Sequence, residues 1–166
     1  MRVYLPSTVP GLRALLDSQL LSAPLPGFAV TGALREWYAE GNEEELEYAA
    51  LSLAARASVR LLDRALLLDP SVSPRRVVIV VEVGDVEPVP DVDRAAVRLN
   101  ADVPMRLVQA VHVDDSTAEA DVRAAAEQLV EADLGSEDAA FAVEQAEGHE
   151  LGWYATQEIG PLLELS

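Results

Sequence analysis

The sequence contains no cysteine and no lysine, and its 12 basic residues are all arginines. Without cysteine it can form no disulfide, no thiolate nucleophile and no cysteine-based zinc site. Without lysine it has neither the phosphate-binding lysine of a Walker loop nor the amine that Schiff-base and pyridoxal chemistry require. Its 9 glycines are too scattered to form the G-x-G-x-x-G turn of dinucleotide-binding proteins. These absences exclude several common classes of enzyme.

Positive charge is also scarce, because 12 arginines stand against 29 acidic residues and the formal net charge is −17. A field of this sign repels phosphate backbones and anionic lipid surfaces, so we expect no nucleic-acid and no membrane partner. Charge alone leaves an acidic mimic of nucleic acid open as an alternative. The longest apolar runs, such as VVIVVEV at 77–83, are far shorter than the roughly 20 residues that span a bilayer. Because no basic and apolar leader is visible, we expect a cytoplasmic protein.

Hydrophobic periodicity predicts a single domain over residues 1–166 that mixes helices and strands. Residues 43–68 form the longest helical pattern, and 77–83 is a nearly continuous β-branched run typical of a central strand. The prolines and glycine of SAPLPG predict a loop at 22–27. Further strands are expected at 2–6, 94–100, 106–113 and 151–155. We therefore predict an α+β fold: a mixed, mainly antiparallel sheet of four or five strands with the long helix packed on it. A ferredoxin-like arrangement is one form of this fold.

The glutamate run in REWYAEGNEEELEYAALSLAARAS, residues 35–58, raises the choice between a chemical site and a helix start. Asn42 is a good N-cap, and Glu45 three residues later completes a capping box. The intervening glutamates face the positive end of the helix dipole. The run therefore predicts a helix start, and Gly41 is placed to end the preceding helix in a left-handed conformation.

Apolar residues at steps of three and four predict which side of this long helix is buried. The predicted stripe consists of Leu46, Ala49, Ala50, Leu53, Ala57, Leu61, Ala65 and Leu68. Because half of these are alanines, the helix can approach the sheet closely.

Two helix starts are expected nearer the C-terminus. Ser116 and Glu119 form a second capping box, which predicts a helix that begins there. Ser136 is placed to cap a helix over 137–147, although FAVEQA and HELGWY could instead pair as a hairpin. The S-E-D start favours the helix.

Several longer strings of the sequence, MRVYLPST, FAVTGALREWYAEGNEEELEYAALSLAARAS, VHVDD and HELGWYATQEI, resemble an actinobacterial family of domains of unknown function. The resemblance covers essentially the whole chain. It implies a single cytoplasmic domain of actinobacterial origin. It implies no activity, cofactor or catalytic residue, so no site is transferred from it.

Each of the two tryptophans is followed by a tyrosine, in Trp37-Tyr38 on a helix and Trp153-Tyr154 on a strand. Adjacent side chains point in different directions in both settings. We interpret Trp37 and Trp153 as core anchors. The alternative is that they form the walls of a ligand cleft, which makes Trp37, Tyr38, Trp153 and Tyr154 the candidate ligand-binding residues.

Motifs for catalysis are missing. The string HELGW begins like a zinc-protease helix but has Trp153 where the second histidine belongs, and no serine lies in a G-x-S-x-G turn. His112 and Asp114 are two residues apart on a predicted strand, so both project from one face. With Glu150, or a carboxylate from the 40–47 cluster, as a third ligand they form the candidate metal site, for Mg²⁺, Mn²⁺ or Zn²⁺. The alternative is that Asp114, Asp115 and Ser116 form a solvated turn and helix cap.

The function that these observations favour is that of a non-enzymatic cytoplasmic protein. It is expected to act through an unidentified protein or small-molecule partner, and to form a homodimer. The alternative is a divalent-metal-assisted hydrolase that uses carboxylates and His112. The sequence indicates no particular catalytic residue, and apart from the metal hypothesis no cofactor is expected.

Overall fold

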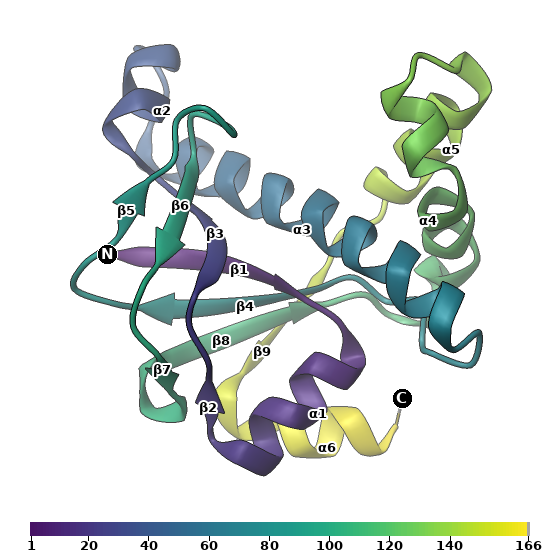
Figure 1. Ribbon diagram of the computed structural model, residues 1–166, viewed down its shortest axis with the longest axis horizontal. Helices are drawn as coiled ribbons and strands as arrows, with labels where there is room; N and C mark the ends of the chain where they lie inside the picture. Colours follow the sequence, from purple (N-terminus) through teal and green to yellow (C-terminus); the bar gives the residue numbers. More distant parts are fainter. Residues whose placement is uncertain (166) are drawn as a thin grey trace.

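The computed structural model describes residues 1–165, which fold around a seven-stranded sheet in the order β5-β6-β3-β1-β4-β8-β9 (Figure 1). Every neighbouring pair in this sheet is antiparallel. The strands are β1 Arg2–Ser7, β3 Leu25–Ala29, β4 Val77–Glu82, β5 Glu87–Pro88, β6 Ala96–Leu99, β8 Val108–Val113 and β9 Gly152–Ala155. A separate two-stranded sheet pairs β2 Leu20–Leu21 with β7 Val103–Pro104. The predicted α+β fold is confirmed.

The sheet is larger than the four or five strands expected. Strand β5 has only 2 residues and gives no periodic signal. Strand β3 begins at Leu25, inside the segment 22–27 that we predicted as a loop. Proline and glycine weaken a strand pattern. Here Pro26 and Gly27 are accommodated between β1 and β6.

Helices cover both faces of the sheet, as Figure 1 shows. The long helix α3 lies across one face, and the short helices α1 and α6 pack on the opposite face. Helices α4 and α5 pack against each other beside the C-terminal half of α3. The helices are α1 Val9–Ser18, α2 Gly32–Trp37, α3 Glu43–Leu68, α4 Glu119–Asp133, α5 Glu137–Glu147 and α6 Ile159–Glu164. Short 3₁₀ turns are η1 Met105–Leu107, η2 Ser116–Ala118 and η3 Thr156–Glu158.

Alternating residues of the strands build two separate cores. Val3 and Ile79 face α1 and α6, together with buried leucines of α1. Tyr4 and Val78 face α3, where they contact its alanines. All residues of β4 from Val77 to Val81 are buried, so the predicted central strand is confirmed.

The connections contain one split β-α-β unit. Strands β3 and β4 lie on either side of β1 and are joined through α2 and α3. A ferredoxin-like fold follows the order β-α-β-β-α-β. The present order of elements does not reproduce it, because β8 and β9, which α4 and α5 join, are direct antiparallel neighbours.

The predicted start of α3 is confirmed. The Asn42 side chain accepts a hydrogen bond from the Glu45 amide at 2.9 Å. Glu43 forms an ion pair with Arg35, 2.8 Å between Oε2 and Nη1. The prediction for Gly41 was wrong, because α2 already ends at Trp37. Within residues 1–165 the glycine with a left-handed conformation is Gly135, whose φ is 101°.

The buried side of α3 differs from the predicted stripe. Its buried residues are Leu46, Ala50, Ala54, Ala55, Ser58, Val59 and Leu62. Leu61 and Leu68 are exposed instead, at 38% and 89%. A helix so rich in apolar residues carries more than one stripe with the right spacing, and the contacts with the sheet decide between them. Ser58 is buried because its hydroxyl donates to the Ser7 carbonyl at 2.7 Å and accepts from the Val77 amide at 3.0 Å.

At the C-terminal helices one prediction is confirmed and one is wrong. The segment 137–147 is helix α5, and Ser136 caps it by accepting from the Ala139 amide at 3.2 Å. The capping box at Ser116 and Glu119 is not formed. Instead Asp115 accepts from the Thr117 amide at 2.9 Å and begins the 3₁₀ turn η2, after which α4 starts.

Among the described residues, none of the helices is both long enough and apolar enough to cross a membrane.

Candidate functional site

The face of the sheet that carries α3 is covered only in part, and a groove of 400 Å³ runs along its open half. We call it the sheet groove. Its floor is formed by Tyr4, Val80, Ala110, His112 and Trp153, and its wall by residues of α3, Glu44, Glu47, Tyr48 and Leu51. Arg2 and Gln109 complete the lining.

The register of the strands explains why these distant residues share one face. Tyr4 pairs with Val80, and Val80 in turn with Ala110. Two residues further along β8, on the same face, His112 pairs with Trp153 of the edge strand β9. The register shifts between Val80 and Val81, which leaves Gln109 as the extra residue of a bulge. Four strands that are far apart in the sequence therefore contribute to the floor.

Of the charged side chains that line the groove, the one arginine forms an ion pair and the others are carboxylates. Arg2 lies 3.2 Å from Glu47, between Nη1 and Oε2. The pKa of Arg2 is raised, first by its hydrogen bond with Tyr4 and then by the neighbouring carboxylates. Burial raises the pKa of the Tyr4 hydroxyl. Burial also lowers the pKa of His112, which favours a neutral imidazole.

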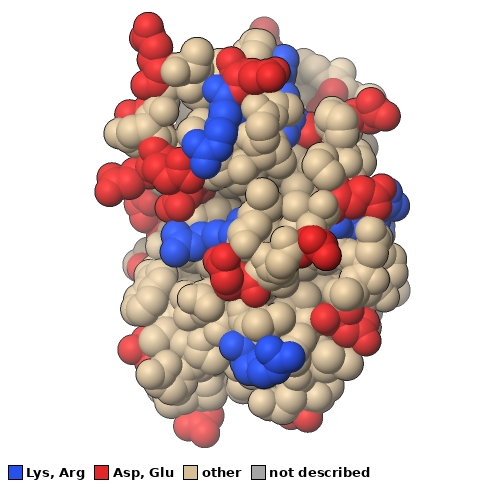
Figure 2. Space-filling view, turned by 90° about the vertical axis from the view of Figure 1, so that its left-hand side faces the viewer, with Lys and Arg blue, Asp and Glu red and all other residues tan. Residues whose placement is uncertain are grey.

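Pairing of arginines with carboxylates extends over the neighbouring surface. Figure 2 shows the side that carries the N-terminus and α2, where blue and red side chains lie next to each other in the upper part. The pairs include Arg35 with Glu43 at 2.8 Å and Arg98 with Glu87 at 2.9 Å. Such exposed pairs contribute little stability, but they neutralise the scarce positive charge.

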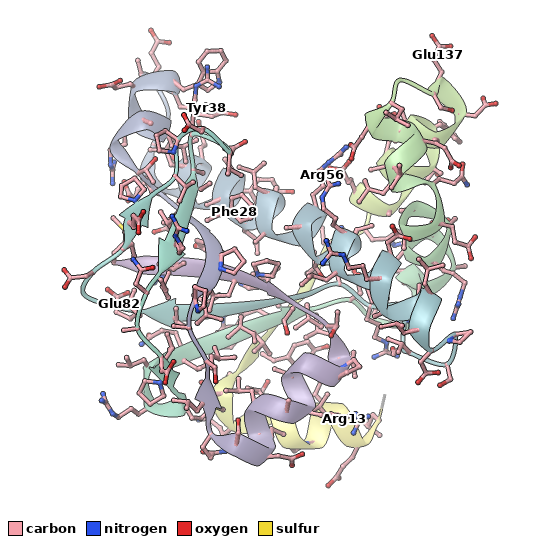
Figure 3. All side chains as sticks on the ribbon, in the orientation of Figure 1. Arg13, Phe28, Tyr38, Arg56, Glu82 and Glu137 are labelled. Carbon is pink, nitrogen blue, oxygen red and sulfur yellow. The ribbon has the colours of Figure 1, made fainter. Side chains whose placement is uncertain are left out.

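Tyr48 stands between the sheet groove and two further hollows on the sides of α3. One hollow, of 490 Å³, lies beside α2 and is lined by Trp37, Tyr38 and Arg94. The other, of 70 Å³, lies between α3 and α5, and Arg56 lines it and contacts Glu147 at 3.0 Å. Figure 3 shows Arg56 on the side of α3 that faces α5, and Tyr38 at the end of α2. The Tyr48 hydroxyl itself donates to Glu150 at 3.3 Å.

The two tryptophans are not core anchors, and that interpretation was wrong. Trp37 and Trp153 are each 61% exposed. Tyr38 is also exposed, whereas Tyr154 packs against the core on the α1 and α6 side. Adjacent residues of β9 point to opposite faces, so only Trp153 of that pair reaches the sheet groove. Trp37 and Tyr38 lie in the separate hollow beside α2.

The residues of the predicted metal site have different surroundings. His112 lines the sheet groove. Asp114 is buried, and its carboxylate accepts three hydrogen bonds from Arg76, at 2.8, 2.8 and 2.7 Å. Glu150 accepts from Tyr48. Within residues 1–165 no group of three or more histidine or acidic side chains is placed to hold a metal ion. The metal site stays a prediction, while Asp115 has the helix-capping role of the alternative.

Of the groove lining, the site residues that sequence reasoning singled out are His112 and Trp153; it missed others, among them Arg2, Tyr4, Tyr48 and Gln109. One signal was present, because strand alternation puts Arg2 and Tyr4 on the same face. Their position next to Val80 and His112 depends on strand order, which alternation does not give.

Comparison with known proteins places the chain in a family. It belongs to DUF6912, a family of unknown function, whose model matches residues 1–163. The predicted resemblance to domains of unknown function is thereby confirmed, and the match names no organism. No curated protein and no solved structure matches the chain.

Proposed function

We propose that this protein is a non-enzymatic binding protein and that the sheet groove holds a small molecule. The observation that carries the proposal is the position of Trp153, 61% exposed on the floor of the groove and paired across the strands with His112. An aromatic ring that lines a hollow beside apolar side chains and a few polar groups is a common feature of ligand sites. Its strand β9 pairs with β8, which fixes the backbone of Trp153 on this face of the sheet.

The size and lining of the groove support the same proposal. Its 400 Å³ lies within the roughly 300 to 1,000 Å³ typical of small-molecule sites. Apolar side chains, Leu51, Val80 and Ala110, supply contact area, and a few polar groups supply orientation. The lining has no serine, threonine or cysteine beside His112, so the histidine-activated hydroxyl or thiol of the common hydrolases is not formed in this groove.

A fragment screen followed by nuclear magnetic resonance tests the proposal. The chain has 2 tryptophans, so its two indole N–H signals can be assigned with a Trp37→Phe variant. Ligands of the groove are expected to move the Trp153 signal in a saturable way and to leave the Trp37 signal unchanged. Trp153→Ala should abolish binding, and Trp37→Ala is the matched control. A screen in which no fragment moves the Trp153 signal at millimolar concentration would contradict the proposal.

The proposal includes a cytoplasmic location and a homodimer. The acidic surface, at a formal −17, supports function away from nucleic acid and anionic membranes. Sedimentation at increasing protein concentration tests the dimer, which requires a mass of twice 17.8 kDa.

A further inference from the structure

We infer that the sheet groove selects an organic cation, an ammonium or guanidinium group attached to an apolar body. The inference rests on the proposed function, since it names the class of ligand for the same groove. It is carried by the charge of the lining, by the exposed face of Trp153 and by a contact elsewhere in the molecule that shows the same chemistry.

The charge of the lining favours a cation. The formally charged residues that line the groove are Arg2, Glu44 and Glu47. Arg2 is already matched by Glu47 at 3.2 Å, and within residues 1–165 no ion pair is described for Glu44. The lining thus holds one uncompensated carboxylate in a chain whose formal net charge is −17. This carboxylate and the net negative charge of the chain would both repel an anionic ligand, and both would attract a cation.

His112 does not reverse this balance. It is the titratable base on the floor of the groove, which Arg2, Glu44 and Glu47 also line. Because burial lowers its pKa, the imidazole is neutral near pH 7. The floor therefore adds hydrogen-bonding capacity without adding positive charge.

The molecule already contains a cation on a tryptophan. The guanidinium carbon of Arg94 lies 3.6 Å from the centre of the Trp37 ring. Trp153 has the same exposure, 61%, but within residues 1–165 no cation is described over its ring. An indole face is the best aromatic site for a cation, and desolvation strengthens the contact. A ligand cation would lie over the ring of Trp153 in the way that the Arg94 guanidinium lies over the ring of Trp37.

The groove is larger than a single charged group. Leu51, Val80 and Ala110 line it beside the polar residues, so an apolar body attached to the cation would contact them. Burial of that body adds hydrophobic free energy to the electrostatic attraction.

Three probes with one aromatic body and different charges test the inference: phenethylammonium, 2-phenylethanol and 3-phenylpropionate. Each is titrated into the wild-type protein while the Trp153 indole signal is followed. Phenethylammonium should bind about tenfold more tightly than the alcohol, the size of a strong cation–π contact, and 3-phenylpropionate should bind most weakly. Glu44→Gln should weaken the cation several-fold and leave the alcohol unchanged. Glu137→Gln, on α5 and away from the groove, removes the same charge and is the matched control.

The outcomes separate the inference from the proposed function. If the alcohol or the carboxylate binds as tightly as the ammonium, the inference is overturned, and the proposed function stands because the groove has bound a ligand. If phenethylammonium does not move the Trp153 signal at all, the inference is also overturned, and the fragment screen alone decides the proposed function. Equal effects of Glu44→Gln and Glu137→Gln would show that only the net charge of the chain acts, which contradicts selection by the groove.

Discussion

Arg76 and Asp114 form a buried ion pair at the end of the sheet, with 2.7 Å between Nη2 and Oδ1 and side chains that are 3% and 0% exposed. The pair links three segments. Asp114 also accepts from the Arg76 backbone amide at 2.8 Å, and Arg76 donates to the His149 carbonyl at 2.8 Å. The start of β4, the end of β8 and the turn after α5 are therefore held together by one guanidinium and one carboxylate.

Removal of one partner should be strongly destabilising. Asp114→Ala leaves a buried guanidinium without its counter-charge, and we expect a loss of about 3 to 5 kcal/mol in the free energy of unfolding. Urea unfolding followed by circular dichroism measures it. The double variant Arg76→Met/Asp114→Leu, which leaves no buried charge, should be more stable than Asp114→Ala. A single variant within 1 kcal/mol of wild type, on the scale of an exposed pair, would contradict the assignment.

The N-cap of α3 gives a second prediction. Asn42→Ala removes the acceptor for the Glu45 amide and should destabilise the protein by about 0.5 to 2 kcal/mol. Asn42→Asp keeps an acceptor and should stay close to wild type. Glu45→Ala should have the smaller effect, because the structure describes the bond from its backbone amide and none from its side chain to Asn42. Thermal unfolding of the three variants checks the order, and an Asn42→Ala protein as stable as wild type contradicts it.

Local signals in the sequence were sufficient for most of the elements. A polar residue followed by acidic residues marked the starts of α3 and α5, and the β-branched run marked β4. These signals work because caps and strand propensities act over a few residues. The buried stripe of α3 could not be predicted in the same way, because its choice depends on contacts with Tyr4 and Val78 of the sheet.

The sheet groove was beyond sequence reasoning for a related reason. Tyr4, Val80, His112 and Trp153 come together through three cross-strand pairings and a bulge, none of which leaves a local pattern. Trp153 and His112 were singled out from the sequence, but for different roles. Only the register shows that they are direct neighbours.

His112 should make stability depend on pH. Burial lowers its pKa in the folded protein, so the unfolded chain binds the proton more readily. The stability it contributes is fully present above the unfolded value of about 6.5, and it is lost as the pH falls through the lowered pKa of the folded state. Titration of the His112 ring proton in folded protein and in urea measures both values. His112→Gln should flatten the stability profile between pH 7 and pH 5, and an unchanged slope in that variant would contradict the prediction.

The contact of Arg94 with Trp37 should be measurable as a coupling. A double-mutant cycle with Arg94→Ala and Trp37→Leu is expected to give about 0.5 to 1 kcal/mol, the range for an exposed cation–π contact. The backbone carbonyl of Arg94, which accepts a hydrogen bond from Thr31, is retained in the alanine variant. Chemical unfolding of the four proteins supplies the cycle. A coupling of zero would show that the 3.6 Å approach does not stabilise the fold.

The close packing of β3 against β1 depends on Gly27. A Cβ atom at this position would lie 2.8 Å from Leu5 Cδ2, 2.8 Å from Val3 Cγ1 and 3.2 Å from the Tyr4 carbonyl. Gly27→Ala should therefore overpack the centre of the sheet and lower the free energy of unfolding by about 1 to 3 kcal/mol. Gly160→Ala is the matched control, because nothing lies within 4 Å of its added Cβ and alanine is the better residue in helix α6. The two variants should differ in sign in urea unfolding, with Gly160→Ala at or above wild-type stability. A Gly27→Ala protein as stable as the Gly160→Ala protein would mean that Val3 and Leu5 can move aside, and that β1 and β3 are packed less tightly than the distances require.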